Sequence, residues 1–343
     1  MHELYFEDFP VGAGGECAPR LVTREEIIAF AREFDPQPFH LSEEAAKGTF
    51  VGELIASGWH TCSVTMRIIY DCFLSRSASM GAPGIEEVKW MSPVRPGDTL
   101  TARWSILETR LSRSRPKMGL ARVRVVLVNQ RGETAYDMSY WMMAERRKAA
   151  SSTDGDDANT PSGATAAATS IARSPAPNIA SSAIDSAGYF EDLAVGETNA
   201  AGSYEFTAQN IIRFAKVFDP QPFHIDPQAA AKSHFGGLCA SGWHTGSACM
   251  RKLIDRRLAI RERLKAQGRK LPGLGSSPGF KNLVWHKPVY AGDTVDFATT
   301  LVSKRVSASR PGWGLIFSRN TGTNQRGELV YEFTGSVFVE RRA

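Results

Sequence analysis

The chain has 343 residues, of which 42% are hydrophobic and 22% charged, a composition typical of a globular protein with two ordinary domains. Its net charge of +5 comes from lysines and arginines spread along the chain, so the stripe expected of a nucleic-acid-binding protein is missing. No apolar run approaches the roughly 20 residues of a membrane helix, and we expect neither nucleic-acid nor membrane partners.

The start of the chain, MHELYFEDFPVG, is acidic and lacks an apolar core, so we do not expect a signal peptide. The cysteines follow no zinc or redox spacing, and their odd number argues against a disulfide framework. They are Cys17, Cys62, Cys72, Cys239 and Cys249. We therefore expect a cytoplasmic protein.

The first predicted element is an amphipathic helix that ends near residue 34. Thr23 and Glu26 form a capping box, and apolar residues follow at the i, i+3, i+4, i+7 spacing of a helix. Those apolar residues are Ile27, Phe30, Ala31 and Phe34. The heptapeptide FDPQPFH at 34–40 comes next, and its prolines end the helix because the residue before a proline is pushed out of the α region.

Beyond the heptapeptide, Ser42 begins a short helix, and the stretch 56–74 predicts a long buried helix. Arg67 and Asp71 are four residues apart and are expected to pair across one turn. The remaining segments alternate like strands and turn at Arg131-Gly132. One buried helix followed by antiparallel strands predicts an α+β fold in which a sheet wraps a central helix.

The same pattern occurs twice in the chain. At an offset of 184, FDPQPFH recurs at 218–224 and ASGWHT at 240–245, and 17 of the 28 aligned positions from 34 to 61 are identical. PVRPGDT and NQRGE recur at an offset of 195, so the second copy carries an insertion of 11 residues within 255–279. We predict a duplicated domain, with copies at 1–147 and 188–343. The stretch 148–187 lacks aromatic residues and predicts a flexible linker.

Asp35 and His40 lie on the segment stiffened by Pro36 and Pro38, where two side chains can be held toward one gap. A carboxylate and an imidazole facing one water molecule can perform general acid–base chemistry. Alternatively, the prolines only stop the helix, the aspartate caps the next turn and the histidine packs below it. The second copy supplies Asp219 and His224.

Gly58 and Gly242 begin the predicted buried helices, where unpaired backbone N–H groups could receive a developing oxyanion. The repeated His60 and His244 are expected to line the pocket or to make a contact at the helix start. A metal site of Asp35, His40 and His60 is disfavoured because no metal-ligand spacing supports it, so we expect no metal. No glycine-rich phosphate loop or GxSxG elbow is present.

The order and spacing of these motifs resemble the MaoC-like hot-dog family, which includes (R)-specific enoyl-CoA hydratases and acyl dehydratases. The resemblance covers both halves and implies a double hot-dog in which the two copies pair within the chain. It implies that Asp35 with His40, and Asp219 with His224, activate water, while the Gly58 and Gly242 amides hold the enolate oxygen.

Two departures from the family put the substrate preference in doubt: the family's frequent Asn is replaced by Gln, and its His before the helix glycine is replaced by Ser. Arg115 and Arg310, near strand ends, either meet coenzyme A phosphates or lie on a solvated face. The candidate substrate-binding residues are Gln37, Gln221, Ser57, Ser241, Trp59, Trp243, His60, His244, Arg115 and Arg310.

The leading prediction is a hydratase that reversibly adds water to a trans-2-enoyl thioester, with an acyl-CoA substrate and no separate cofactor. The resemblance implies an (R)-3-hydroxyacyl product. A hot-dog thioesterase and a module that binds acyl thioesters without turnover are the alternatives. The acyl chain, the choice between coenzyme A and a carrier protein, the number of working sites and homo-oligomerisation are left open.

Overall fold

The computed structural model describes residues 3–147 and 188–342, so the predicted linker at 148–187 lies outside the described residues. The first copy opens with the 3-10 turn η1 (Phe6–Asp8). Its strands are β1 (Gly14–Glu16), β2 (Arg20–Leu21), β3 (Gly84–Trp90), β4 (Thr99–Leu111), β5 (Met118–Asn129) and β6 (Thr134–Glu145). Its helices are α1 (Arg24–Phe34), α2 (Pro38–Leu41), α3 (Glu43–Lys47) and α4 (Gly58–Cys72), followed by the 3-10 turn η2 (Leu74–Arg76).

The second copy repeats this order with few changes. It begins with the 3-10 turn η3 (Phe190–Asp192). Its helices are α5 (Ala208–Phe218), α6 (Pro222–Ile225), α7 (Pro227–Lys232) and α8 (Gly242–Ala266). Its strands are β7 (Thr198–Phe206), β8 (Gly279–Trp285), β9 (Asp293–Val306), β10 (Trp313–Asn324) and β11 (Leu329–Glu340). The early strands β1, β2 and β7 are absent from the sequence-based prediction, because short segments with little alternation give no clear strand signal.

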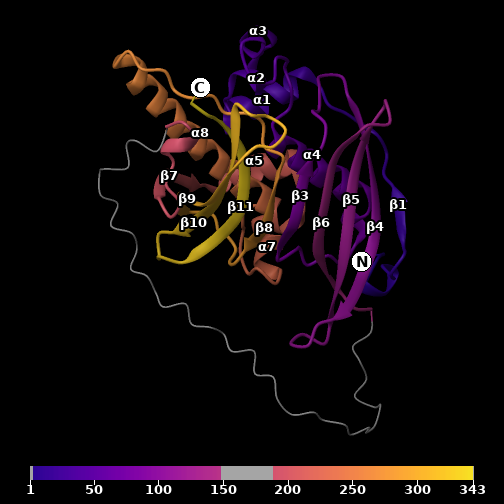
Figure 1. Ribbon diagram of the computed structural model, residues 1–343. Coiled ribbons are helices and arrows are strands. Elements are labelled where there is room, and N and C mark those ends of the chain that lie inside the picture. Colours follow the sequence, from indigo (N-terminus) through magenta and orange to yellow (C-terminus); the bar gives the residue numbers. More distant parts are fainter. Residues whose placement is uncertain (1–2, 148–187, 343) are drawn as a thin grey trace, which may run out of the picture.

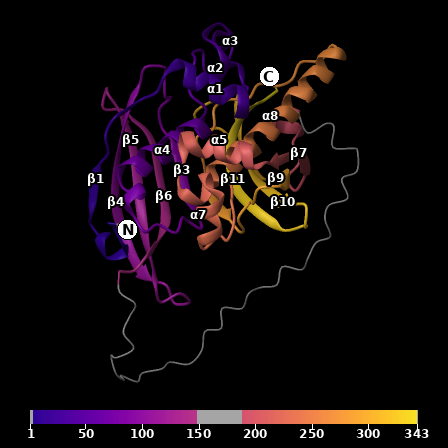
Figure 2. The same cartoon turned by 180° about the vertical axis from the view of Figure 1, so that it is seen from behind.

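The described strands form one continuous antiparallel sheet in the order β1-β4-β5-β6-β3-β8-β11-β10-β9-β7, with β2 beside β4. Strands β3 and β8 join the two copies through the centre of this sheet, with Val88 opposite Phe280. Figures 1 and 2 show the two halves side by side, with α4 and α8 packed on the sheet. The expected α+β fold is confirmed: each copy wraps a sheet around a long helix.

The helix ends follow from local sequence signals. Thr23 accepts a hydrogen bond from the Glu26 amide and begins α1, as its capping position predicts. Ser42 and Asp226 cap α3 and α7 in the same way. FDPQPFH, expected to be a stiffened segment that ends the helix, also contains the helical turn α2, which begins at Pro38. A proline suits the first position of a helix because its φ is already helical and its missing N–H is not needed there.

Helices of the two copies are tied together by a reciprocal pair of arginines. Arg67 in α4 pairs with Asp71 at 2.7 Å, as predicted, and also donates to the Lys216 and Val217 carbonyls at the end of α5. Arg251 in α8 makes the same contacts with the Arg32 and Glu33 carbonyls at the end of α1. Each copy therefore caps the helix that leads into the other copy's heptapeptide.

The two central helices differ in length. Helix α4 has 15 residues and ends at Cys72, and the next residue, Phe73, packs with Phe9 and Trp104 inside the first copy. Helix α8 has 25 residues and absorbs much of the insertion predicted from the repeat offsets. Figure 1 shows its C-terminal turns, in orange, projecting past the sheet. The interiors of the two copies therefore cannot be filled in the same way.

The structure corrects the expectation about disulfides, because Cys17 and Cys72 are bonded. Cys62, Cys239 and Cys249 are free and buried. An odd number of cysteines argues only against a framework that uses all of them, and it permits a single bond. The cysteine pattern therefore gives no ground for a reducing compartment. None of the helices within the described residues is long and apolar enough to cross a membrane.

Candidate functional site

Asp35 and His40 come together where α1 gives way to α2. Asp35 is the C-terminal cap of α1, and His40 lies in the single turn of α2. Both side chains are buried, with 2% and 4% of their surfaces exposed, and His40 Nε2 lies 3.4 Å from Asp35 Oδ2. The heptapeptide therefore does bring the carboxylate and the imidazole to one place.

Hydrogen bonds fix the orientation of both groups. Gln37 Nε2 donates to Asp35 Oδ1 at 2.9 Å, and Ser57 Oγ donates to Asp35 Oδ2 at 2.6 Å. His40 Nδ1 lies 2.7 Å from the Ile55 carbonyl oxygen, which can only accept, so the proton sits on Nδ1. Nε2 then faces the carboxylate side, where it can take part in proton transfer.

Gly58 begins α4 directly after these groups. Ser57 caps the helix by accepting from the Trp59 amide at 3.2 Å. A Cβ on Gly58 would lie 2.5 Å from the indole of Trp90, so this position requires glycine for packing as well as for access to its amide. Gly58 lines the same cavity as Asp35 and His40, and its N–H belongs to the first helical turn, where amides lack partners within the helix.

The second copy reproduces this arrangement. His224 Nε2 lies 3.5 Å from Asp219 Oδ2, which accepts from Ser241 at 2.6 Å, and Gln221 donates to Asp219 Oδ1 at 2.9 Å. Gly242 begins α8, and a Cβ there would lie 2.2 Å from Trp285. Burial lowers the pKa of His224 below its ordinary value.

A cavity of about 600 Å³ opens beside the pair of the first copy. Asp35, His40 and Gly58 line one part of it, while residues of α8, β10 and β11 line the rest. Neither Asp219 nor His224 lines this cavity. The first copy therefore supplies the Asp35–His40 pair, and the interior of the second copy supplies much of the remaining wall.

Aromatic side chains crowd the corresponding approach to the second pair. Phe235 contacts Phe223 and His234, with ring centroids 4.9 and 4.0 Å apart. Tyr290 donates from its hydroxyl to the Phe235 carbonyl at 2.8 Å and holds this cluster in place. At the repeat offsets, Phe235 and Tyr290 replace Val51 and Arg95 of the first copy.

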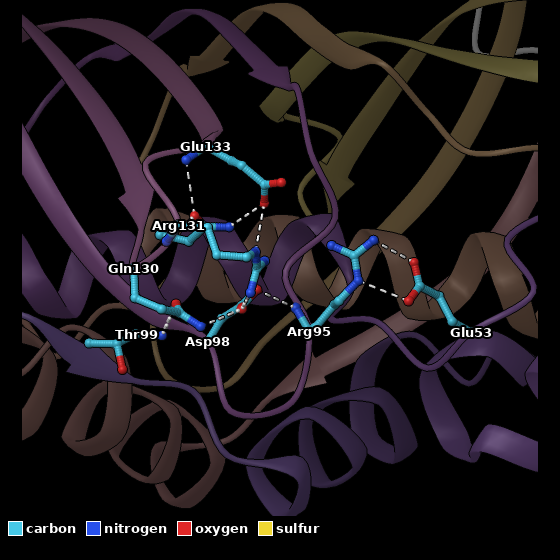
Figure 3. A network of polar contacts seen from close by, with 8 residues as sticks. Glu53, Arg95, Asp98, Thr99, Gln130, Arg131 and Glu133 are labelled. Carbon is cyan, nitrogen blue, oxygen red and sulfur yellow. Dashed lines mark hydrogen bonds and ion pairs between the residues drawn. The ribbon is translucent and has the colours of Figure 1, made fainter.

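The repeated motifs PVRPGDT and NQRGE meet in a polar network beside the cavity (Figure 3). Asp98, which is 1% exposed, accepts from Gln130 at 3.2 Å and from Arg131 at 2.8 Å, and this ion pair helps to lower its pKa against burial. Arg95 donates to Asp98 through its amide and to both oxygens of Glu53 through its guanidinium. Because Glu53 lines the cavity, this network braces its wall.

Arg310 and Arg115 each reach the opposite copy. Arg310, from the second copy, is exposed, lines the cavity and lies 4.5 Å above the Phe50 ring of the first copy. Burial, followed by the positive charge of Arg115, lowers the pKa of His234, which is the second-copy counterpart of Phe50. Each arginine, expected to act within its own half, lies against the other half, with Arg310 over Phe50 and Arg115 near His234.

The two repeated histidines of ASGWHT are buried away from the cavity. His60 is 0% exposed, and its Nε2 lies 3.1 Å from Glu26, while His244 Nε2 lies 3.4 Å from the Tyr204 hydroxyl. Neither lines this cavity, so of the two expected roles the structure agrees with a contact near the helix start rather than a place in the cavity wall. No metal-binding cluster is found among the described residues.

The remaining predicted substrate-binding residues differ between the copies in whether they line the cavity. Gln37 and Trp59 line the cavity, and Trp59 stacks on Phe280 with ring centroids 5.1 Å apart. Gln221, Ser241 and Trp243 are buried counterparts that do not line it. Ser57 is also buried and acts through its bond to Asp35.

Sequence reasoning missed the α8 residues that line the cavity. Met250, Leu253, Ile254, Arg257 and Ile260 fall on one face of α8 at helical spacing. The signal was present in the chain, because at the offset of 184 Arg257 stands where the first copy has Phe73. Comparing the interiors of the two repeats would have found it.

The model of the MaoC like domain matches residues 12–129 and 194–311, which is well over half of the chain. The Bacillus subtilis protein YdeM, which is uncharacterized, is 28% identical over 145 residues, covering 42% of this chain and 100% of YdeM. A 3-hydroxybutyryl-CoA dehydratase of Methylorubrum extorquens is 32% identical over 109 residues, which span 32% of this chain and 60% of that protein.

Solved structures agree on the fold along the whole chain. A MaoC domain protein of Chloroflexus aurantiacus has a TM-score of 0.77 at 17% identity, covering 99% of this chain and 98% of that one. A Mycobacterium tuberculosis protein with a double hot-dog fold has a TM-score of 0.69 at 16% identity, covering 98% of each chain. The chain therefore has the double hot-dog fold and belongs to the MaoC-like dehydratase family, whose domain it carries in two tandem copies.

Proposed function

We propose that the protein is a hydro-lyase that reversibly adds water to a trans-2-enoyl-CoA, and that Asp35 and His40 of the first copy perform the chemistry. The observation that carries this proposal is the cavity beside the buried Asp35–His40 pair, a cavity that Asp219 and His224 of the second copy do not line. The family and the dehydratase relative support the reaction class.

In the proposed mechanism one water molecule sits between His40 Nε2 and Asp35. His40 accepts a proton as the water oxygen adds to C3 of the enoyl group, and the carboxylate accepts a hydrogen bond from the second water hydrogen. The pair then returns a proton to C2, so the elements of one water molecule end on C3 and C2. Ser57 and Gln37 keep the carboxylate in place through their bonds of 2.6 and 2.9 Å.

Charge develops on the thioester oxygen during this addition. The Gly58 amide, at the first position of α4 and in the cavity wall, is the proposed donor to that oxygen. The coenzyme A phosphates are proposed to meet Arg310, because this exposed guanidinium stands beside the cavity. No separate cofactor is needed, and the expected product is an (R)-3-hydroxyacyl-CoA.

The experiment is to follow the loss of enoyl-thioester absorbance with crotonyl-CoA, comparing the parent with the Asp35→Asn variant. We expect hydration by the parent and a fall in kcat of at least about 100-fold in the variant. Chiral analysis of the product tests the (R) assignment. Free thiol released without hydroxyacyl-CoA would instead indicate a thioesterase, and tight binding without turnover of any chain length would indicate a binding module.

A further inference from the structure

We propose that the part of the cavity inside the second copy binds a carboxylate at the far end of the acyl group, so that the substrate is the thioester of a dicarboxylic acid. This inference rests on the proposed function, since it assigns the acyl class of the same site. It is carried by Arg257 and by the polar replacements around it.

Helix α8 presents a mainly apolar face to the cavity, with Arg256 and Arg257 as its charged residues. Met250, Leu253, Ile254 and Ile260 occupy it at helical spacing, and Arg257 occupies the position between them. A helix face that packs over an acyl chain would be expected to continue with an apolar residue. The first copy has an apolar residue at the equivalent position, because Phe73, directly after α4, is 3% exposed in its core.

The strands that face α8 also carry smaller and more polar residues than their counterparts in the first copy. At the offset of 195, Thr299, Ser318 and Asn320 line the cavity where the first copy has Trp104, Val123 and Val125. Gly335 likewise replaces Tyr140. These replacements remove volume and add hydrogen-bonding groups. A cavity built only for a longer alkyl chain would need the removed volume but not the added hydrogen-bonding groups.

Arg257 has spare hydrogen-bonding capacity. Its guanidinium donates to the Pro272 carbonyl at 2.6 Å, and no carboxylate of the described residues forms an ion pair with it. Burial, and then the charge of Arg261, lower its pKa to about 10, so it remains a cation at neutral pH. Neighbouring Arg256 is already engaged by Asn199 at 2.7 Å. A carboxylate would give Arg257 the counter-charge that the protein does not provide.

The test compares pairs of trans-2-enoyl-CoA substrates of six, eight and ten carbons that end in a methyl group or a carboxylate. At the best-fitting length, we expect the parent to show a kcat/KM at least about 10-fold higher for the carboxylate. Arg257→Met should lose that preference while still hydrating the methyl-terminated substrate, which shows that fold and chemistry are intact. Arg261→Met removes an exposed cation from the same helix and should keep the parent preference.

A binding measurement separates this inference from the proposed function. Calorimetry with saturated hexanoyl-CoA and adipoyl-CoA, and with their longer counterparts, requires no turnover. Tighter binding of the dicarboxylic thioester that disappears in Arg257→Met supports the subsite even if neither substrate class is hydrated. A parent that favours methyl-terminated ligands at every length, or a preference unchanged by Arg257→Met, overturns it while leaving hydration itself standing.

Discussion

His40 lies 3.4 Å from Asp35, and its counterpart His224 lies 3.5 Å from Asp219. Duplication has therefore preserved the geometry of the pair in both copies. The surroundings have diverged, because a cavity opens onto the first pair and aromatic rings crowd the second. The geometry of an Asp–His pair and the access of substrate to it are therefore separate properties.

Single substitutions should affect the two copies unequally. Asp35→Asn is expected to lower kcat by at least about 100-fold, because it removes a carboxylate beside the proposed water. Asp219→Asn is the matched control and should leave kcat within about 3-fold of the parent. Steady-state hydration of crotonyl-CoA measures both, with circular dichroism to establish folding. Equal losses in the two variants would contradict a single working site.

Restoring a first-copy side chain inside the second copy should shorten the accepted acyl group. Thr299→Trp introduces the residue found at the equivalent Trp104 and occupies part of the cavity. Hydration of crotonyl-CoA should change by less than about 3-fold, while kcat/KM for ten-carbon substrates should fall at least about 10-fold. A uniform fall across chain lengths would show that the acyl group does not extend toward Thr299.

The reciprocal arginine caps should contribute to stability across the two copies. Arg67→Met removes the donor to the Lys216 and Val217 carbonyls, and we expect a loss of about 1–2 kcal/mol because these groups are partly exposed. Asp71→Asn weakens only the bridge within α4 and should cost less than about 0.5 kcal/mol. Urea unfolding of both variants measures the difference, which should vanish if the cross-copy contact contributes nothing.

Reduction of the disulfide should also lower stability. The bond between Cys17 and Cys72 closes a loop with a sequence separation of 55, for which loop entropy gives about 4 kcal/mol. Reduced protein should therefore unfold at a lower urea concentration than oxidised protein. The Cys17→Ser, Cys72→Ser double variant should respond to a reducing agent with no shift in its midpoint, and a shift there would assign the effect to another thiol.

Acid should destabilise the protein partly through His244. Burial lowers its pKa in the folded chain to about 3, whereas an unfolded histidine titrates near 6.5. Between these two pKa values the unfolded state binds more protons than the folded state. The contribution of His244 to the free energy of unfolding is therefore fully present above about pH 6.5 and falls as the pH drops below it.

One such histidine contributes up to about 1.4 kcal/mol per pH unit. Replacing His244, which stacks on Phe214 with centroids 4.7 Å apart, by Phe should flatten the dependence of the unfolding free energy on pH. Urea titrations between pH 4.5 and 7 measure that slope. A variant that remains as acid-sensitive as the parent would assign the effect to other groups.

The sequence predicts those features that depend on neighbouring residues. Caps at Thr23 and Ser42, the pairing of Arg67 with Asp71, and the turn at Gly132 all depend on contacts within a few positions. The repeat itself reveals the duplicated fold. Asp35 and His40 are predictable for the same reason, since a short rigid segment carries both.

The features that the sequence does not reveal depend on residues far apart in the chain. Arg310 lies beside the other copy's Phe50, and Cys17 meets Cys72, only because the sheet and helices pair as they do. The burial of His60 likewise depends on Glu26 and on α5 of the second copy, since Phe218 packs edge-on against its ring. Spacing along one strand or helix cannot reveal such contacts.

Joining both copies in one chain has a genetic consequence. In a symmetric homodimer every substitution appears twice, so an interior that changes to hold a new ligand would change in both subunits. Here the β3–β8 junction keeps the two lobes in register while each has its own codons. Selection can therefore specialise one lobe for recognition without disturbing the reacting groups of the other.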